Sequence, residues 1–229
     1  MTSEAGNNTI ALLLSGGLDS SILLGQLLRE GRRVQPLYIR CGLAWQDEEL
    51  RAVGRFLCAV AAKELEGLVI LDLPVRDLYG DHWSVTGDDV PDARSADDAV
   101  YLPGRNALLL VKAAVWCRLH GIGELALAVL RSNPFADATP EFFAEFESAL
   151  ARATSGRVRI VRPFGAMSKR EVMALGRGLP LELTFSCIAP RGGRHCGACN
   201  KCAERQAAFE AIDGSDPTEY VTLQEGAKG

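Results

Sequence analysis

Long apolar runs and an excess of basic charge are both missing from this 229-residue sequence. No apolar stretch is long enough to cross a bilayer, and the opening residues, MTSEAGNN, lack the basic-then-apolar pattern of a signal peptide. The formal net charge is −4, so the chain has no basic field that would attract nucleic acid. We therefore expect a cytoplasmic protein with neither a membrane partner nor a nucleic-acid partner.

A disulfide framework is not expected either, although the sequence contains seven cysteines. Cysteines of a cytoplasmic chain are normally free thiols or metal ligands. Three of them, Cys41, Cys58 and Cys117, lie within apolar strand or helix patterns. We expect each of these three to be a small buried apolar side chain.

Strand patterns and helix patterns alternate along the chain. Short apolar runs predict strands at residues 10–14, 33–39, 67–73, 124–130 and 158–161. Helical spacing predicts helices that begin at residue 18 and that cover residues 46–65, 106–120, 140–152, 169–177 and 200–212. Thr139 and Ser168 are the expected N-caps of two of them. This order predicts an α/β fold with a doubly wound, five-stranded parallel sheet.

The chain divides into three expected segments. Residues 1–180 are expected to form the α/β domain, and residues 181–212, with four cysteines and the last helix, a C-terminal metal-binding subdomain. Residues 213–229 are polar, and we expect this tail to be loosely held. Ligands of such sheets bind beyond the carboxyl ends of the strands. The loop after the first strand and the irregular segments 76–105 and 131–137 are therefore expected to meet at one cleft.

The stretch LLLSGGLDSS joins the first strand to the first helix. Gly16 and Gly17 let a ligand approach the main chain, and the helix start presents free N–H groups and the positive end of its dipole. Ser15, Ser20 and Ser21 add hydroxyl donors. An ordinary turn would explain two glycines alone, but the combination indicates a phosphate site. The Gly-Lys-Ser/Thr of a Walker A loop is absent.

Four cysteines gather near the C-terminal end of the sequence: Cys187, Cys196, Cys199 and Cys202. Four thiolates suit a closed tetrahedral Zn²⁺ site, which leaves no open position for catalysis. A [4Fe–4S] cluster takes the same ligands and is the alternative. We expect His195 to be a surface residue or a neighbour of the ligands. The pattern therefore predicts a structural zinc site.

The segment SGGLDS resembles the SGGxDS signature of the PP-loop ATP pyrophosphatases, which split ATP into AMP and pyrophosphate. The resemblance implies that this loop binds the pyrophosphate end of ATP. The ATP-binding residues expected on this basis are Leu14, Ser15, Gly16, Gly17, Leu18, Asp19, Ser20 and Ser21, together with Arg105.

The order of the remaining motifs is more specific. PGRN at 103–106, the segment 137–142 and the ending CxxCxxCxxR at 196–205 follow the phosphate loop. Over roughly residues 9–210 the chain resembles the 7-cyano-7-deazaguanine synthase family of queuosine biosynthesis. The resemblance implies a PP-loop fold, a structural zinc and an ATP-dependent C–N ligase. Such an enzyme adenylates the carboxylate of 7-carboxy-7-deazaguanine, and ammonia converts it to the amide and then to the nitrile.

Three charged residues suit that adenylation and are the expected catalytic residues. Asp19, at a helix start, is either a helix cap or a ligand of Mg²⁺. Arg105, after a Pro-Gly turn, is either a surface arginine or a clamp for phosphate or carboxylate. Lys169 opposes the dipole of its own helix, which indicates an anionic partner such as the α-phosphate; a solvated lysine is the alternative.

The segment 130–142 departs from the family pattern. Asp137 and Glu141 match it, but its Gly-Tyr and Cys-Arg elements are missing. Because this loop is expected to face the base, we expect Phe135, Asp137 and Glu141 to bind substrate. Phe135 would stack on the base or pack under the Pro134 turn. The departure leaves open an enzyme that stops at the amide or joins the activated acid to another amine.

Two further functions remain as alternatives. One is a sulfur-inserting PP-loop enzyme that acts on RNA, which the net negative charge disfavours. The other is a nucleotide-binding sensor without turnover, which an intact SGGLDS disfavours. The expected partners are the deazapurine carboxylate and ammonia or another amine, and a homodimer is an alternative to a monomer.

Overall fold

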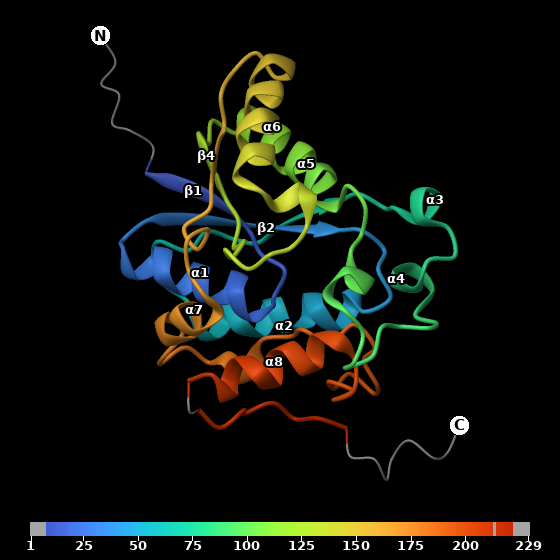
Figure 1. Cartoon of the computed structure of the whole chain (residues 1–229). Coiled ribbons are helices and arrows are strands. Elements are labelled where there is room, and N and C mark those ends of the chain that lie inside the picture. Colours follow the sequence, from blue (N-terminus) through green and yellow to red (C-terminus); the bar gives the residue numbers. More distant parts are fainter. Residues whose placement is uncertain (1–7, 213, 222–229) are drawn as a thin grey trace.

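A single parallel sheet organises the protein, whose computed structural model describes residues 8–212 and 214–221. Within these residues, five strands pair in the order β3-β2-β1-β4-β5. The strands are β1 (Thr9–Leu13), β2 (Arg33–Arg40), β3 (Val69–Asp72), β4 (Glu124–Ala126) and β5 (Arg159–Val161). The chain builds outward from the central β1 to one edge and then to the other, as Figure 1 shows. The predicted doubly wound parallel sheet is confirmed.

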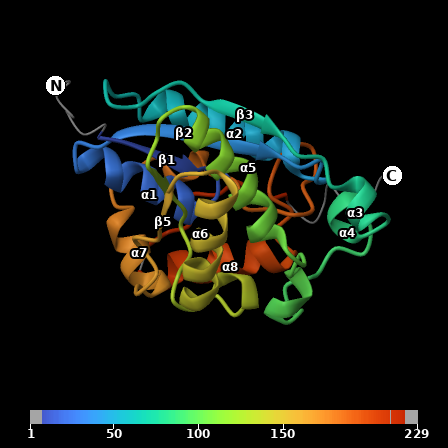
Figure 2. The same cartoon turned by 90° about the horizontal axis from the view of Figure 1, so that it is seen from above.

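Helices connect the strands along the described chain. The α-helices are α1 (Leu18–Arg29), α2 (Gln46–Ala59), α3 (Arg76–Tyr79), α4 (Trp83–Thr86), α5 (Arg105–Leu119), α6 (Pro140–Ala153), α7 (Lys169–Leu175) and α8 (Asn200–Glu210). Short 3-10 turns are η1 (Asp97–Val100), η2 (Ala136–Ala138) and η3 (Leu181–Leu183). The short helices α3 and α4 lie beyond one end of the sheet (Figure 2). Of the helices described, none combines the length and apolarity that crossing a membrane requires.

Two hydrophobic clusters cover the two faces of the sheet. On one face, buried side chains of α1, α2, α7 and α8 pack on inward residues of β1 such as Ile10 and Leu12. On the other, α5 and α6 pack on Ala11 and on Leu125 of β4. Figure 1 shows the same division, with α5 and α6 above the sheet. Burial on both faces explains why the strands read as continuous apolar runs.

A third hydrophobic cluster joins the C-terminal segment to the α/β domain. Cys187, Ile188 and Cys199 pack in it with Trp45, at the start of α2, and with Leu102, before α5. Shared burial of this kind holds the two segments together over apolar surface. The segment that carries the four cysteines is therefore packed directly beside the loops that follow β2 and precede α5.

The ends of two helices follow their capping residues. The Thr139 hydroxyl accepts a hydrogen bond from the Phe142 N–H at the start of α6. Ser168 and Glu171 form the reciprocal capping box of α7, and Glu171 accepts from the Ser168 N–H at 2.7 Å. Both predicted N-caps are confirmed.

Helix α2 ends six residues earlier than predicted, at Ala59. The chain turns there because Leu65 returns to the sheet edge, where it bridges Val34. Cys58 is exposed, so the expectation that it is buried was wrong. It lies two positions from the buried Phe56, a separation that places the two side chains on opposite sides of a helix. Cys41 and Cys117 are buried as predicted.

Candidate active site

The predicted phosphate loop lies between β1 and α1. Gly16 has a φ of 80°, and a Cβ there would lie 2.8 Å from Val53 Cγ2, so both conformation and space require glycine. The carbonyl of Gly16 accepts a hydrogen bond of 2.8 Å from the Phe185 N–H, which fixes the loop from the C-terminal side. Helix geometry leaves the first N–H groups of α1 without intrahelical partners. They are available to an anion.

The hydroxyls of this loop do not all face the same way. Ser15 Oγ and Ser20 Oγ lie 3.1 Å apart, and both residues line a cavity in front of the loop. Ser21 is fully buried, and its hydroxyl has no hydrogen-bond partner within the described residues. Leu14 is buried in the sheet core, and Gly16 does not line the cavity. The side chains of the loop that the structure brings to the cavity are therefore those of Ser15, Leu18, Asp19 and Ser20.

The cavity has a volume of about 350 Å³ and opens between the phosphate loop and the C-terminal segment. Small-molecule sites commonly fall between about 300 and 1,000 Å³. Its walls come from α1, α2, α5, α7 and α8 and from the loops after β4 and η3. It therefore lies where the carboxyl ends of parallel strands are expected to bind a ligand.

Asp19 and Lys169 meet inside this cavity from opposite ends of the chain. Lys169 Nζ donates to both carboxylate oxygens of Asp19 at 2.8 Å, and it lies 3.5 Å from Glu204. Burial raises the pKa of Asp19, and the ammonium of Lys169 opposes that rise. Burial lowers the pKa of Lys169, but the two carboxylates more than offset it and raise the pKa overall. The 2.8 Å contacts thus join the two side chains in a partly buried ion pair that an incoming charged ligand would meet.

Arg105 and Asp137 also line the cavity, and they differ in their hydrogen-bond partners. Arg105 Nε is buried and has no hydrogen-bond partner in the described part of the chain. Asp137 is 7% exposed, and its Oδ2 accepts from the Asn106 N–H at 3.0 Å. The Asn106 side chain donates to Asp137 Oδ1 and to its carbonyl. Asp137 therefore holds the start of α5, whereas the Nε of Arg105 is buried without a described partner.

Two of the four described aromatic residues that line the cavity, Phe135 and Tyr101, form a ring pair that we call its aromatic wall; the others are Trp45 and Phe185. The ring centroid of Phe135 lies 4.9 Å from that of Tyr101, and both residues line the cavity. Phe135 also packs against two hydrophobic clusters, so it combines a packing role with an exposed face. Glu141 is exposed on the first turn of α6 and does not line this cavity. The expected substrate residues are thus separated, with Glu141 outside.

The sequence patterns did not single out Glu49, which lines the cavity, or Tyr38, which lies behind it on β2. Glu49, on α2, lines the cavity, and its Oε2 accepts a hydrogen bond of 2.6 Å from the Tyr38 hydroxyl. Burial raises the pKa of Glu49 to about 7 and also raises that of Tyr38. An acidic residue in the first turn of a helix is ordinary in any sequence. Its pairing with a strand tyrosine gave no sequence signal.

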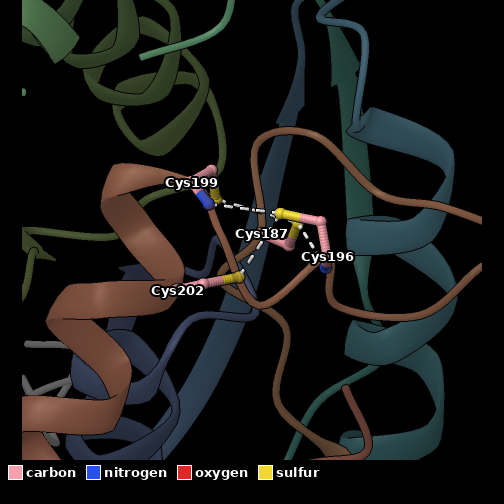
Figure 3. Close-up of side chains that lie close together, drawn as sticks. All are labelled: Cys187, Cys196, Cys199 and Cys202. Atoms are coloured by element: carbon pink, nitrogen blue, oxygen red, sulfur yellow. Dashed lines mark hydrogen bonds between the residues drawn. The ribbon is translucent and has the colours of Figure 1, made fainter. Parts of the chain in front are cut away.

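The four cysteines of the C-terminal segment form one cluster beside the cavity. Their sulfur atoms all lie within 4.8 Å of one another, and two pairs, Cys187–Cys199 and Cys196–Cys202, lie 3.9 Å apart. Figure 3 shows the side chains pointing toward a common point from the loop and from α8. Sulfurs bound to one tetrahedral ion at about 2.3 Å would be about 3.8 Å apart. The cluster therefore fits a single metal ion.

Backbone donors surround these sulfurs. The N–H groups of Ala189 and Cys196 point to Cys187 Sγ, at 3.4 and 3.3 Å. Those of Ala198 and Cys199 point to Cys196 Sγ, at 3.4 and 3.3 Å. Such donors offset the negative charge of thiolates. The arrangement thus supports ionised sulfur ligands.

His195 is buried, with 6% of its surface exposed, and so it is a neighbour of the cysteines and not a surface residue. Its Nε2 accepts a hydrogen bond of 3.1 Å from the Ser186 N–H, and its ring lies against Phe185. Burial lowers the pKa of His195 to about 4, which agrees with an imidazole that accepts rather than donates at Nε2. His195 therefore supports the loop that carries Cys187 and Cys196.

Part of the expected loose tail is held against this segment. Arg205 is 1% exposed and donates to Thr184, Ser186 and the Leu181 carbonyl, and its Nε donates to the Thr218 hydroxyl. The Val221 N–H donates to the His195 carbonyl. Thr218 and Val221, within the expected loose tail, are therefore held by hydrogen bonds to the C-terminal segment. Residues 213 and 222–229 lie outside the described part.

Comparisons with known proteins agree with this architecture. The family model of "Queuosine biosynthesis protein QueC" matches residues 9–213. A 7-cyano-7-deazaguanine synthase from Desulfotalea psychrophila is 34% identical over 92% of this chain and 97% of its own. One from Ralstonia pickettii is also 34% identical, again over 92% and 97%.

A solved structure with low sequence identity shares the fold. It is a 4-thiouridine synthetase in complex with RNA and bound ATP, at 17% identity and a TM-score of 0.51. The match covers 90% of this chain and 50% of that one, and it supports the PP-loop architecture alone. The family match spans the sheet, the phosphate loop and the cysteine cluster, and it shows that this chain belongs to the QueC family of queuosine biosynthesis proteins.

Proposed function

We propose that this protein is an ATP-dependent synthase that converts 7-carboxy-7-deazaguanine to 7-cyano-7-deazaguanine. In the proposed reaction the carboxylate is adenylated with release of pyrophosphate, ammonia gives the amide, and a second adenylation gives the nitrile. One observation carries the proposal beyond family membership. One cavity combines the phosphate loop, the Asp19–Lys169 ion pair and the aromatic wall.

The phosphate end of ATP is assigned to the loop after β1. The free N–H groups at the start of α1 and the hydroxyls of Ser15 and Ser20 suit the oxygens of the departing pyrophosphate. Fixed donors that face developing negative charge lower the barrier to its formation. This assignment requires no movement of the loop, because Gly16 is already fixed by Phe185.

The charged pair is assigned to the reacting phosphate. Because Lys169 already uses both oxygens of Asp19, the two side chains neutralise each other before ligand binds. We propose that Lys169 turns to the α-phosphate and that the freed Asp19 carboxylate helps to hold Mg²⁺, which would neutralise phosphate charge. The guanidinium of Arg105, a residue that lines the cavity, suits the carboxylate of the substrate or a phosphate oxygen.

The heterocycle is assigned to the wall of Phe135 and Tyr101. A flat deazapurine can stack on an aromatic ring and leave its carboxylate directed to the charged end of the cavity. Asp137 would contribute through its hold on α5, and the exposed Glu141 would contribute only if its loop moved toward the base.

We assign the cysteine cluster to a structural Zn²⁺. The 3.9 Å sulfur spacings suit one tetrahedral ion, whereas a [4Fe–4S] cluster binds each thiolate to a different iron and needs a wider cage. Four sulfur ligands leave no open position. The metal would hold the loop of Phe185 and Ser186 at the cavity edge and take no part in the reaction.

The test is product analysis by mass spectrometry. The protein is incubated with ATP, Mg²⁺, ammonia and 7-carboxy-7-deazaguanine, and each product has its own mass. Nitrile, with AMP and pyrophosphate, supports the proposal. Accumulation of amide alone would indicate that the altered 130–142 segment stops the reaction at the first stage. If no pyrophosphate is released in response to 7-carboxy-7-deazaguanine, the proposal is refuted.

A further inference from the structure

The carboxylates of the cavity differ in what they already bind. Among the described lining residues they are Asp19, Glu49, Asp137 and Glu204. Asp19 and Glu204 lie against the ammonium of Lys169, and Glu204 also against Lys201 at 2.6 Å. Asp137 accepts from Asn106. Three of the four are thus occupied by a cation or by a helix start.

Glu49 is the exception. It accepts hydrogen bonds from the neutral side chains of Tyr38 and Trp45, and none of the ion pairs in the described part of the chain involves it. It stands next to the phosphate loop, since its carbonyl oxygen would lie 3.3 Å from a Cβ on Gly16. Glu49 therefore faces the cavity without a direct ion pair, although the positive charge of Arg105, on the same cavity, acts on it.

The proposed chemistry needs such a group. When the nitrogen lone pair of ammonia attacks the acyl-adenylate, a C–N bond forms and the C–O bond to AMP breaks, and AMP leaves with that electron pair. The nitrogen must lose one proton to become a neutral amide. Histidine, the commonest general base, is absent from the described cavity lining.

We propose, on the basis of the function proposed above, that Glu49 is the general base that takes this proton, and that Tyr38 is the positioning residue that holds its carboxylate toward the cavity. Glu49 accepts the proton on a carboxylate oxygen and returns it to solvent after product leaves. Tyr38 keeps its own proton throughout, because burial and the adjacent Glu49 raise its pKa far above neutrality.

The electrostatic setting agrees with this role. Burial raises the pKa of Glu49 to about 7, while the Tyr38 hydrogen bond and the charge of Arg105 limit that rise. The other titratable group close by, the Cys41 thiol, is buried, and its pKa is also raised. A base works best when its pKa is near the working pH.

The experiment separates the two stages of the reaction. Adenylation alone is measured as ATP–pyrophosphate exchange that depends on 7-carboxy-7-deazaguanine, without ammonia. Product formation is measured with ammonia by mass spectrometry. For Glu49→Gln we expect the ratio of product formation to exchange to fall about 10²–10⁴-fold, the usual range for loss of a general base. The matched control is Glu48→Gln on the same helix, which pairs with Arg51 away from the cavity and should change neither rate.

A second variant tests the proton itself. Tyr38→Phe removes the hydrogen bond that stabilises the Glu49 carboxylate, so the pKa of Glu49 should rise. At a fixed concentration of unprotonated ammonia, the acid limb of the product-formation rate should move to higher pH, while exchange keeps the pH dependence of wild type.

The outcomes are distinct. Equal losses of exchange and product formation in Glu49→Gln would overturn the proposal and make Glu49 part of the ATP site. An unmoved acid limb in Tyr38→Phe would also overturn it. If the wild type shows no ATP–pyrophosphate exchange that depends on 7-carboxy-7-deazaguanine, the proposed function itself is refuted.

Discussion

Lys169 Nζ donates to both carboxylate oxygens of Asp19 at 2.8 Å, although the two residues are 150 positions apart in the sequence. The contact joins the first turn of α1 to the first turn of α7. It puts one charge of each sign beside the free N–H groups of the phosphate loop. Both side chains therefore have to exchange partners if MgATP binds there.

The first prediction concerns Asp19 in ATP activation. Asp19→Asn keeps the shape of the side chain but removes its charge. ATP–pyrophosphate exchange that depends on 7-carboxy-7-deazaguanine should therefore fall about 10²–10³-fold. Asp47→Asn is the matched control, because Asp47 is the second residue of α2 as Asp19 is of α1, but is exposed. Exchange at the wild-type rate in Asp19→Asn would remove Asp19 from the mechanism.

The second prediction concerns the energy of the same pair. Lys169→Met leaves the partly buried Asp19 without its cation, and we expect a loss of about 1–3 kcal/mol in the free energy of unfolding. Adding Asp19→Asn should recover part of that loss, because no unpaired charge then remains. Urea unfolding of the two single variants and the double variant measures the coupling, and strictly additive losses would show that the contact is energetically neutral.

The third prediction concerns the metal. Purified protein should contain one zinc per chain by elemental analysis, and Cys199→Ser should lose the metal and lower the melting temperature, since metal binding is coupled to folding. Cys58→Ser removes an exposed thiol outside the cluster and should change neither quantity. Iron in place of zinc, or full metal content in Cys199→Ser, would contradict the assignment.

The fourth prediction concerns the aromatic wall. Phe135→Ala should weaken binding of 7-carboxy-7-deazaguanine by about 1–3 kcal/mol in isothermal titration, the range for loss of a base–aromatic stack. The control is Phe146→Ala on α6, which removes an equal ring from packing on Phe142 away from the cavity. If both variants lose stability equally and neither loses affinity, Phe135 is a packing residue and another group contacts the base.

The fifth prediction concerns stability against pH. Because the pKa of Glu49 is raised from 4.5 to about 7 on folding, the folded protein holds a proton that the unfolded chain releases in this window. Its contribution to stability is therefore present below pH 4.5 and is lost as the pH rises to about 7. The amide side chain of Glu49→Gln cannot ionise, so the unfolding free energy of the variant should rise relative to that of wild type between these pH values. A difference that stays constant with pH would show that the pKa of Glu49 is not raised.

The strongest features of the site were predictable because they are local in sequence. The turn from β1 into α1 needs only Gly16 and its neighbours, and Cys196, Cys199 and Cys202 lie within one short segment. The alternation of apolar runs with helical patterns likewise predicted a five-stranded parallel sheet, which the structure confirms.

The features that escaped prediction depend on distant partners. Nothing near Glu49 indicates that Tyr38 donates to it, and nothing near Asp137 indicates that Asn106 uses its carboxylate. Helix α2 ends early because Leu65 pairs with Val34, and local helix propensity does not predict such a contact. Tertiary contacts of this kind decide both where an element ends and which side of it is buried.

The bond from Arg205 to Thr218 has a consequence for synthesis of the protein on the ribosome. The phosphate loop is translated early, but its support from Phe185 and its charge partners Lys169 and Glu204 follow more than 140 residues later. Arg205 lines the cavity and is held by a residue later still. Because a domain generally folds as a unit, the phosphate loop can reach its supported form only after these late residues have left the ribosome.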